Sequence, residues 1–84
     1  MPRFFFHTED DGPHRDEEGA ILPDAASAEG EALKVLGELL KDAPGAFWRA
    51  GGLTLRVADE HDLTILTLEV SVTRAAAAPG RVGR

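Results

Sequence analysis

The chain has no cysteine among its 84 residues, and it lacks any long apolar run. Without cysteine there is no disulfide, no thiolate metal ligand and no cysteine nucleophile. No apolar stretch approaches the roughly 20 residues that a membrane-spanning helix needs. The N-terminal segment from Met1 to His7 lacks the long apolar region and the small-residue cleavage site of a signal peptide. These absences predict a soluble, cytoplasmic protein.

Basic residues are few. Nine lysines and arginines face fifteen acids, which gives a formal charge of −6. Such a charge repels nucleic acids and argues against them as partners. The arginines near the C-terminus, Arg74, Arg81 and Arg84, are too few to reverse that expectation. The acids are concentrated between Glu9 and Glu31, so an alternative hypothesis is that this acidic segment binds a basic protein surface.

Groups that carry catalysis are also scarce. The two serines, Ser27 and Ser71, do not lie in the strand-turn-helix elbow of a serine hydrolase. Acid–base work by paired carboxylates needs a pocket that separates their pKa values, whereas residues 16–18 are predicted to lie in an exposed loop. We therefore expect no catalytic residues, no cofactor and no enzymatic activity.

A metal site is possible only through histidine and carboxylate side chains. His7, His14 and His61 do not have the close spacing of a zinc site. Asp10, Asp11 and Gly12 lack the alternating oxygen ligands of a calcium loop. We expect no specific metal site, and we interpret the acidic residues as a solvated patch, consisting of Asp10, Asp11, Asp16, Glu17 and Glu18.

One amphipathic helix is predicted from Asp24 to Ala43. Its apolar face is formed by Ala25, Ala28, Ala32, Val35, Leu36, Leu39 and Ala43, with Leu33 and Leu40 on the flank. Asp24 is a good N-cap, and Pro44-Gly45 is expected to end the helix. Gly30 and Gly37 lie on the outer side, where they either weaken the helix or admit a partner helix; the first interpretation is favoured.

Three strands are predicted around this helix. The first runs from Arg3 to Thr8, with Phe5 and His7 on the opposite face from Phe4 and Phe6. A brief return strand near His14-Arg15 is an option, and residues 20–22 are expected to bring an apolar plug to the core. Leu53, Leu55 and Val57 alternate with polar residues, and so do Leu66, Leu68, Val70 and Val72. Leu63 and Ile65 are out of phase, which predicts a bulge near Ile65. Trp48 is expected to cap one end of the core.

The order of these segments resembles a family of small bacterial proteins catalogued as a domain of unknown function. Its members typically open with a strand like Pro-Arg-Tyr-Phe-Phe-His, and here Pro2 to His7 is followed by an Asp-Gly turn, by residues 16–19 and by Leu22-Pro23-Asp24. The resemblance covers approximately residues 1–72. It departs at Phe4, where a hydroxyl-bearing aromatic is usual, and at Asp62, near a common glycine. The resemblance implies a compact α+β domain and brings no activity.

We therefore predict an α+β fold for residues 1–73, with a disordered tail at residues 74–84. A small, mainly antiparallel sheet of three strands, with a possible short fourth, carries one helix on one face, in the order β-(β)-α-β-β. The sheet face without a helix is a possible interaction surface that includes Phe5, His7, Arg56 and Glu69. The favoured hypothesis is a non-enzymatic interaction or adaptor domain that binds a protein partner or itself through this face or a sheet edge.

Overall fold

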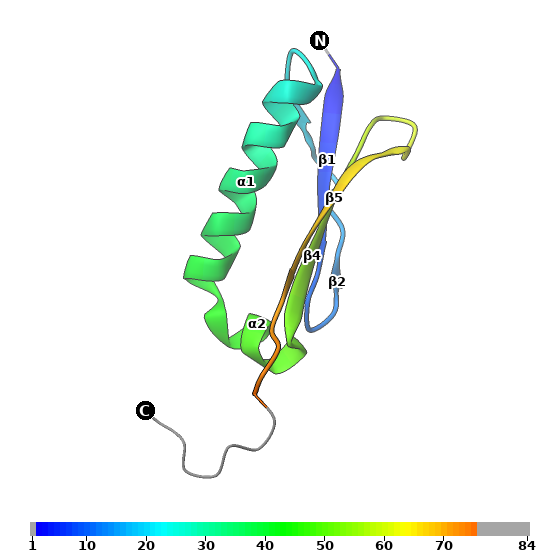
Figure 1. The fold of residues 1–84 in the computed structure, drawn as a ribbon. Coiled ribbons are helices and arrows are strands. Elements are labelled where there is room, and N and C mark those ends of the chain that lie inside the picture. The colour runs from blue at the N-terminus through cyan, green and yellow to red at the C-terminus, as the bar shows by residue number, and fades with distance from the viewer. Residues whose placement is uncertain (1, 76–84) are drawn as a thin grey trace.

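The computed structural model describes residues 2–75, and Met1 and residues 76–84 lie outside that range. Its elements are β1 (Arg3–Glu9), β2 (Pro13–His14), β3 (Ala20–Ile21), α1 (Ala25–Asp42), α2 (Pro44–Ala50), β4 (Gly52–Ala58) and β5 (Thr64–Ser71). The sheet has the order β2-β1-β4-β5, β3 also pairs with β1, and every pairing is antiparallel. α1 runs along one face of the sheet (Figure 1). The predicted α+β class with a mainly antiparallel sheet is confirmed.

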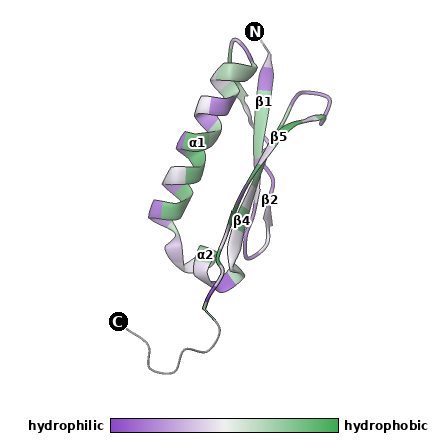
Figure 2. Ribbon diagram, viewed as in Figure 1, coloured by the Kyte–Doolittle hydropathy of each residue, from purple (hydrophilic) through white to green (hydrophobic). Residues whose placement is uncertain are grey.

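Helix α1 begins and ends one residue inside the predicted bounds, because both end residues are caps. The carboxylate of Asp24 accepts a hydrogen bond from the backbone N–H of Ser27 over 2.8 Å, and Ala43 is the C-cap. The apolar face of the helix points toward the sheet (Figure 2). Ala28 and Ala32 at its centre are completely buried, and their small side chains let the helix axis approach the strands closely.

The core lies between α1 and the two central strands. Phe4 and Phe6 come from β1, while Leu55 and Val57 come from β4, and all four are buried with the two alanines of α1. The alternation predicted for residues 53–57 is therefore present, with Leu53 buried as well. Burying large apolar side chains of this kind contributes about 1.5–3 kcal/mol each, which makes β4 the centre of the fold.

β5 is the strand where packing is least complete. Leu66, Leu68 and Val70 point inward as predicted but are only half-buried. In the ladder between β4 and β5, Val57 pairs with Leu66 and Ala58 pairs with Thr64. Ile65 is therefore the extra residue of a β-bulge, as predicted from the change of phase.

Two elements are absent from the sequence-based prediction. Pro44 was expected to close α1, and it does so, but it is also the first residue of α2. A residue before proline is disfavoured in the helical region, which breaks the chain at Ala43, and proline at the first helical position is preorganised for a new helix. Residues 20–22 were expected to be an apolar plug. Ala20 and Leu22 do pack on the core, but Ala20–Ile21 also forms β3 against β1.

The predicted core role of Trp48 is wrong. Trp48 lies on α2 with 54% of its surface exposed, packed edge to face against Phe47 with 5.1 Å between ring centroids. The guanidinium of Arg74 lies 5.3 Å from the centre of the Trp48 ring, a cation–π distance. Trp48 is exposed because it lies on α2, and the sequence analysis did not predict that helix.

The predicted tail at residues 74–84 falls mostly outside the described residues. Neither α1 nor α2, the helices in the described part of the chain, has the length and hydropathy needed to cross a bilayer.

Candidate functional site

The four residues of the predicted interaction surface lie on the sheet face away from α1. Their neighbours along each strand, such as Phe6 and Leu55, are buried on the helix side, so alternation places them on the other side. His7 pairs with Arg56 across β1 and β4, and Arg56 pairs with Thr67 of β5. Glu69 lies in the neighbouring row, opposite Thr54. The alternation pattern was sufficient to predict this shared face.

Phe5 lies on the predicted face of the sheet, but it is not an exposed aromatic. Its side chain is half-buried and stacks on the imidazole of His7, with 6.2 Å between ring centroids and 7° between ring planes. The loop between β2 and β3 also approaches it, because a Cβ at Gly19 would lie only 3.0 Å from Cδ2 of Phe5. Phe5 therefore offers little apolar surface to a partner.

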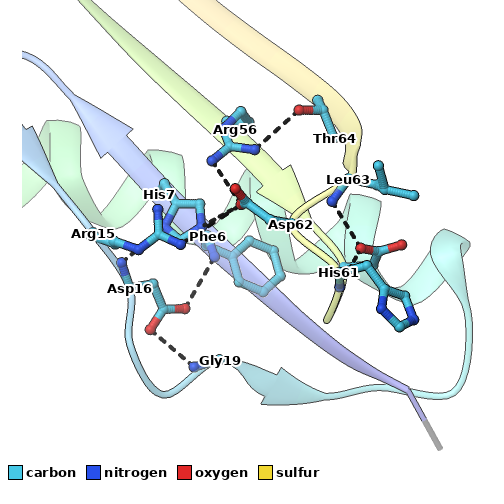
Figure 3. A network of polar contacts seen from close by, with 11 residues as sticks. Phe6, His7, Arg15, Asp16, Gly19, Arg56, His61, Asp62, Leu63 and Thr64 are labelled. Carbon is cyan, nitrogen blue, oxygen red and sulfur yellow. Dashed lines mark hydrogen bonds and ion pairs between the residues drawn. The ribbon is translucent and has the colours of Figure 1, made fainter.

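A polar network covers the part of this sheet face around His7 and Arg56 (Figure 3). Its centre is the carboxylate of Asp62, in the turn between β4 and β5, where the backbone has a φ of 63°. Oδ1 of Asp62 lies 3.1 Å from Nη2 of Arg56, 3.8 Å from Nη2 of Arg15 and 4.0 Å from Nε2 of His7. Arg56 also donates from Nη1 to Oγ1 of Thr64 over 3.1 Å. Three separate segments of the chain thus meet at one carboxylate oxygen.

Asp16 organises the loop beside β1. Its carboxylate accepts backbone hydrogen bonds from Phe6, Gly19 and Glu18, over 3.1, 3.0 and 3.1 Å. Burial alone raises the pKa of Asp16, but these three donors outweigh it and hold the pKa below its usual value. Asp16 is therefore a structural residue, tied to β1 at Phe6.

His7 is held between this loop and the network. Its Nδ1 accepts a hydrogen bond from the backbone N–H of Asp16 over 3.0 Å, so the neutral ring carries its proton on Nε2, the nitrogen nearer Asp62. Burial lowers the pKa of His7, and the nearby guanidinium groups of Arg15 and Arg56 lower it further. The ring is therefore neutral at pH 7.

The five residues of the predicted acidic patch do not form one surface. Asp10 and Asp11 lie at the turn between β1 and β2, where Asp10 is 3.3 Å from Nε2 of His14 and Asp11 pairs with Nε of Arg49 over 2.9 Å. Asp16 lies in the loop between β2 and β3, where its carboxylate accepts backbone hydrogen bonds from Phe6, Glu18 and Gly19. Glu17 and Glu18 follow it in the same loop. Three of these five carboxylates already have partners within the chain.

Two cavities open on this face of the sheet. One, of about 320 Å³, lies over the row of His7, Arg56 and Thr67 and is bordered by Arg15 and His14. The other, of about 290 Å³, lies toward Phe5 and contains the carboxylates of Asp16, Asp59 and Asp62 among its lining groups. His7 and Arg15 border both cavities.

Arg15 and Asp62 are the residues of this site that sequence reasoning missed. Both lie in connections between strands, where side-chain direction does not follow alternation. In the sequence, the only feature that could have indicated these two residues is that each lies next to a predicted strand. Within residues 2–75 no three histidine, aspartate or glutamate side chains are grouped closely enough to hold a metal ion.

The comparison with known proteins identifies the family. No curated protein and no solved structure gave a significant match to the chain. A family model described as "Domain of unknown function (DUF6894)" matches residues 3–71, which extend from the first residue of β1 to the last residue of β5. Because that match covers most of the chain, the protein belongs to the DUF6894 family, whose biological role is unknown.

Proposed function

We propose that this domain is a non-enzymatic interaction module that associates with a second copy of itself through the outer edge of β5. The observation that carries the proposal is the edge itself. β5 is eight residues long and pairs with β4 on one side, and no other strand among residues 2–75 pairs with it. An open strand edge offers a row of backbone donors and acceptors to another strand.

Apolar surface lies directly beside this edge. Leu33 on α1 is 63% exposed, and it forms a shallow hollow of about 240 Å³ with Leu66 and Leu68 of β5. The core between α1, β1 and β4 leaves these β5 side chains half-buried. A partner that extends the sheet beyond β5 would cover this apolar row together with the free backbone groups.

A second copy satisfies this edge by symmetry. Two β5 strands that meet antiparallel about a two-fold axis present the same groups to each other, as in isologous dimers. Glu69 is the only charged residue of β5. An axis at Leu68 places Glu69 opposite Thr67 of the other copy, whereas an axis at Glu69 would place two carboxylates together. The register centred on Leu68 is therefore favoured.

The sheet face away from α1 is the weaker candidate for this contact. It carries the charged network around Asp62, and Phe5 is half-buried there against His7. Desolvating that network in an interface would cost more than covering the row beside β5, because buried charges lose their hydration.

Sedimentation equilibrium over a range of protein concentrations, at low and high salt, tests the proposal. We expect a dimer that persists at high salt, because its contacts are apolar and backbone hydrogen bonds. Leu33→Lys should shift the mass toward the monomer while circular dichroism stays unchanged, since this side chain is mostly exposed. The matched control is Ile21→Lys, on β3, where 50% of the residue's surface is exposed.

A monomer at every concentration would overturn the proposal. A dimer that Ile21→Lys dissociates and Leu33→Lys does not would also overturn it, because the contact would then lie near β3 and not at the edge formed by β5.

A further inference from the structure

The cavity over the His7–Arg56–Thr67 row has an unusual charge for this protein. The chain carries a net charge of −6, yet this cavity is bordered by two guanidinium groups, those of Arg15 and Arg56. Its one acidic border residue, Glu9, lies two residues along β1 from His7, in the row of Thr54 and Glu69. Positive charge is therefore concentrated at the end of the cavity near His7.

Arg15 and Arg56 both have guanidinium N–H groups that are not used in hydrogen bonds within residues 2–75 and could bind a ligand. A guanidinium has five N–H donors. Arg56 uses one toward Asp62 and one toward Thr64. Arg15 makes the 3.8 Å ion pair with Asp62, donates no hydrogen bond within residues 2–75, and has 61% of its side chain exposed. The hydroxyl-bearing Thr67 is the cross-strand neighbour of Arg56 on the same face.

Asp62 shows which chemistry this group of side chains accepts. Arg15, Arg56 and His7 converge on a single carboxylate oxygen (Figure 3). That carboxylate lines the neighbouring cavity, while the two arginines and His7 also border the larger one. Planar guanidinium groups favour carboxylate and phosphate oxygens over other ligands.

The electrostatic potential around His7 is also positive. The neighbouring arginines both lower the pKa of His7, and each has a larger effect than the carboxylate of Asp62, which raises it. Asp16 also raises it, but less than Asp62 does, so at His7 the two guanidinium groups outweigh the two carboxylates, in addition to the lowering by burial. A second anion would be attracted from the open side of the sheet.

We propose that this cavity binds a small oxyanion, through a carboxylate or phosphate group placed between Arg15 and Arg56 beside Thr67. A volume of about 320 Å³ is at the lower end of the range for small-molecule sites, which suits a small metabolite. The proposal does not depend on self-association, because the site is built from one copy.

Amide chemical-shift titrations with inorganic phosphate and with acetate, at pH 7 and low ionic strength, test the site. We expect saturable shifts at His7, Arg56 and Thr67, and the two series show whether phosphate or carboxylate binds more tightly. Sodium chloride at matched ionic strength should not reproduce them. Titration of Leu33→Lys separates this site from the β5 edge, since that variant should bind as the wild type does.

Arg15→Gln is the main variant. It should weaken binding roughly tenfold or more, because it removes a charge-assisted contact. The matched control is Arg49→Gln, since Arg49 is 65% exposed and also pairs with a single carboxylate, that of Asp11, yet does not border the cavity. Asp62→Asn should strengthen binding severalfold, because it removes the competing negative charge.

Any of these results would overturn the proposal: shifts that never saturate up to tens of millimolar anion, equal affinities for Arg15→Gln and Arg49→Gln, or unchanged affinity in Asp62→Asn. A shift pattern centred on other residues would have the same meaning.

Discussion

The backbone N–H of Asp16 donates a hydrogen bond to Nδ1 of His7 over 3.0 Å. A loop residue and a strand residue thus hold each other in place, since the carboxylate of Asp16 in turn accepts from the backbone of Phe6, the next residue back along β1. This pair ties the connection between β2 and β3 to β1, an inner strand of the sheet, and it positions the imidazole beside Arg15 and Arg56 (Figure 3).

Stability should depend on the titration of His7. The groups that face it are Arg15 and Asp16 from the loop, Arg56 from β4 and Asp62 from the turn. Its pKa is lowered in the folded protein from 6.5, so the unfolded chain binds the proton more tightly. The contribution of His7 to the free energy of unfolding is therefore fully present above pH 6.5. It is lost as the pH falls below 6.5 and through the lower pKa of the folded protein.

Urea denaturation at about pH 7.5 and about pH 5.5 measures this loss. His7→Gln should flatten the dependence, and His61→Gln is the control. Asp16, Asp24 and Asp59 have lowered pKa values, so their contributions are lost only at lower pH, below 3.8. An equal slope in His7→Gln and the wild type would contradict the assignment to His7.

Asp16→Asn should destabilise the fold by about 1–3 kcal/mol, because one of its carboxylate oxygens becomes an NH2 group that no longer accepts from the backbone. The donor that loses its acceptor is the N–H of Phe6 if Oδ2 is replaced, or the N–H groups of Glu18 and Gly19 if Oδ1 is replaced. Glu17→Gln, the exposed neighbour, is the control and should change the free energy of unfolding by less than about 0.5 kcal/mol. Equal midpoints for the two variants in urea would show that Asp16 has no structural role.

Gly19→Ala should be more damaging than any other single alanine substitution of a glycine in this loop region. Gly19 has a φ of 71°, and a Cβ there would lie 2.7 Å from the backbone oxygen of Phe4. Left-handed backbone and steric overlap together should cost roughly 2–4 kcal/mol. At Gly12 a Cβ would meet nothing within 4 Å, so Gly12→Ala is the matched control in thermal unfolding. Similar melting temperatures would contradict the geometry of the turn.

Gly37→Ala should stabilise the protein by about 0.5–1 kcal/mol, because it restores helix propensity at an exposed position of α1. A Cβ at Gly37 or at Gly30 would meet nothing within 4 Å, so no steric cost offsets the gain. Urea denaturation at one fixed protein concentration gives the value. A loss of stability, together with a lower solution mass, would instead support the hypothesis that a partner helix packs against these glycines.

Periodicity along the chain determined the main layers of this protein. The spacing of Ala28 and Ala32 predicts the buried face of α1, the alternation of Leu53, Leu55 and Val57 predicts the buried face of β4, and the change of phase at Ile65 predicts the bulge. These features depend on repeats of 3.6 or two residues, which are local properties of the backbone.

Tertiary structure alone decided the site. Arg15 and Asp62 are separated by 47 positions in the chain, yet they meet beside His7 because both lie in connections that fold back over the same sheet face. The direction of side chains in connections follows no period. Likewise, Pro44 is compatible both with the end of α1 and with the start of a new helix. Only the tertiary structure shows that Pro44–Ala50 forms a second helix, which contacts β4 and leaves Trp48 exposed.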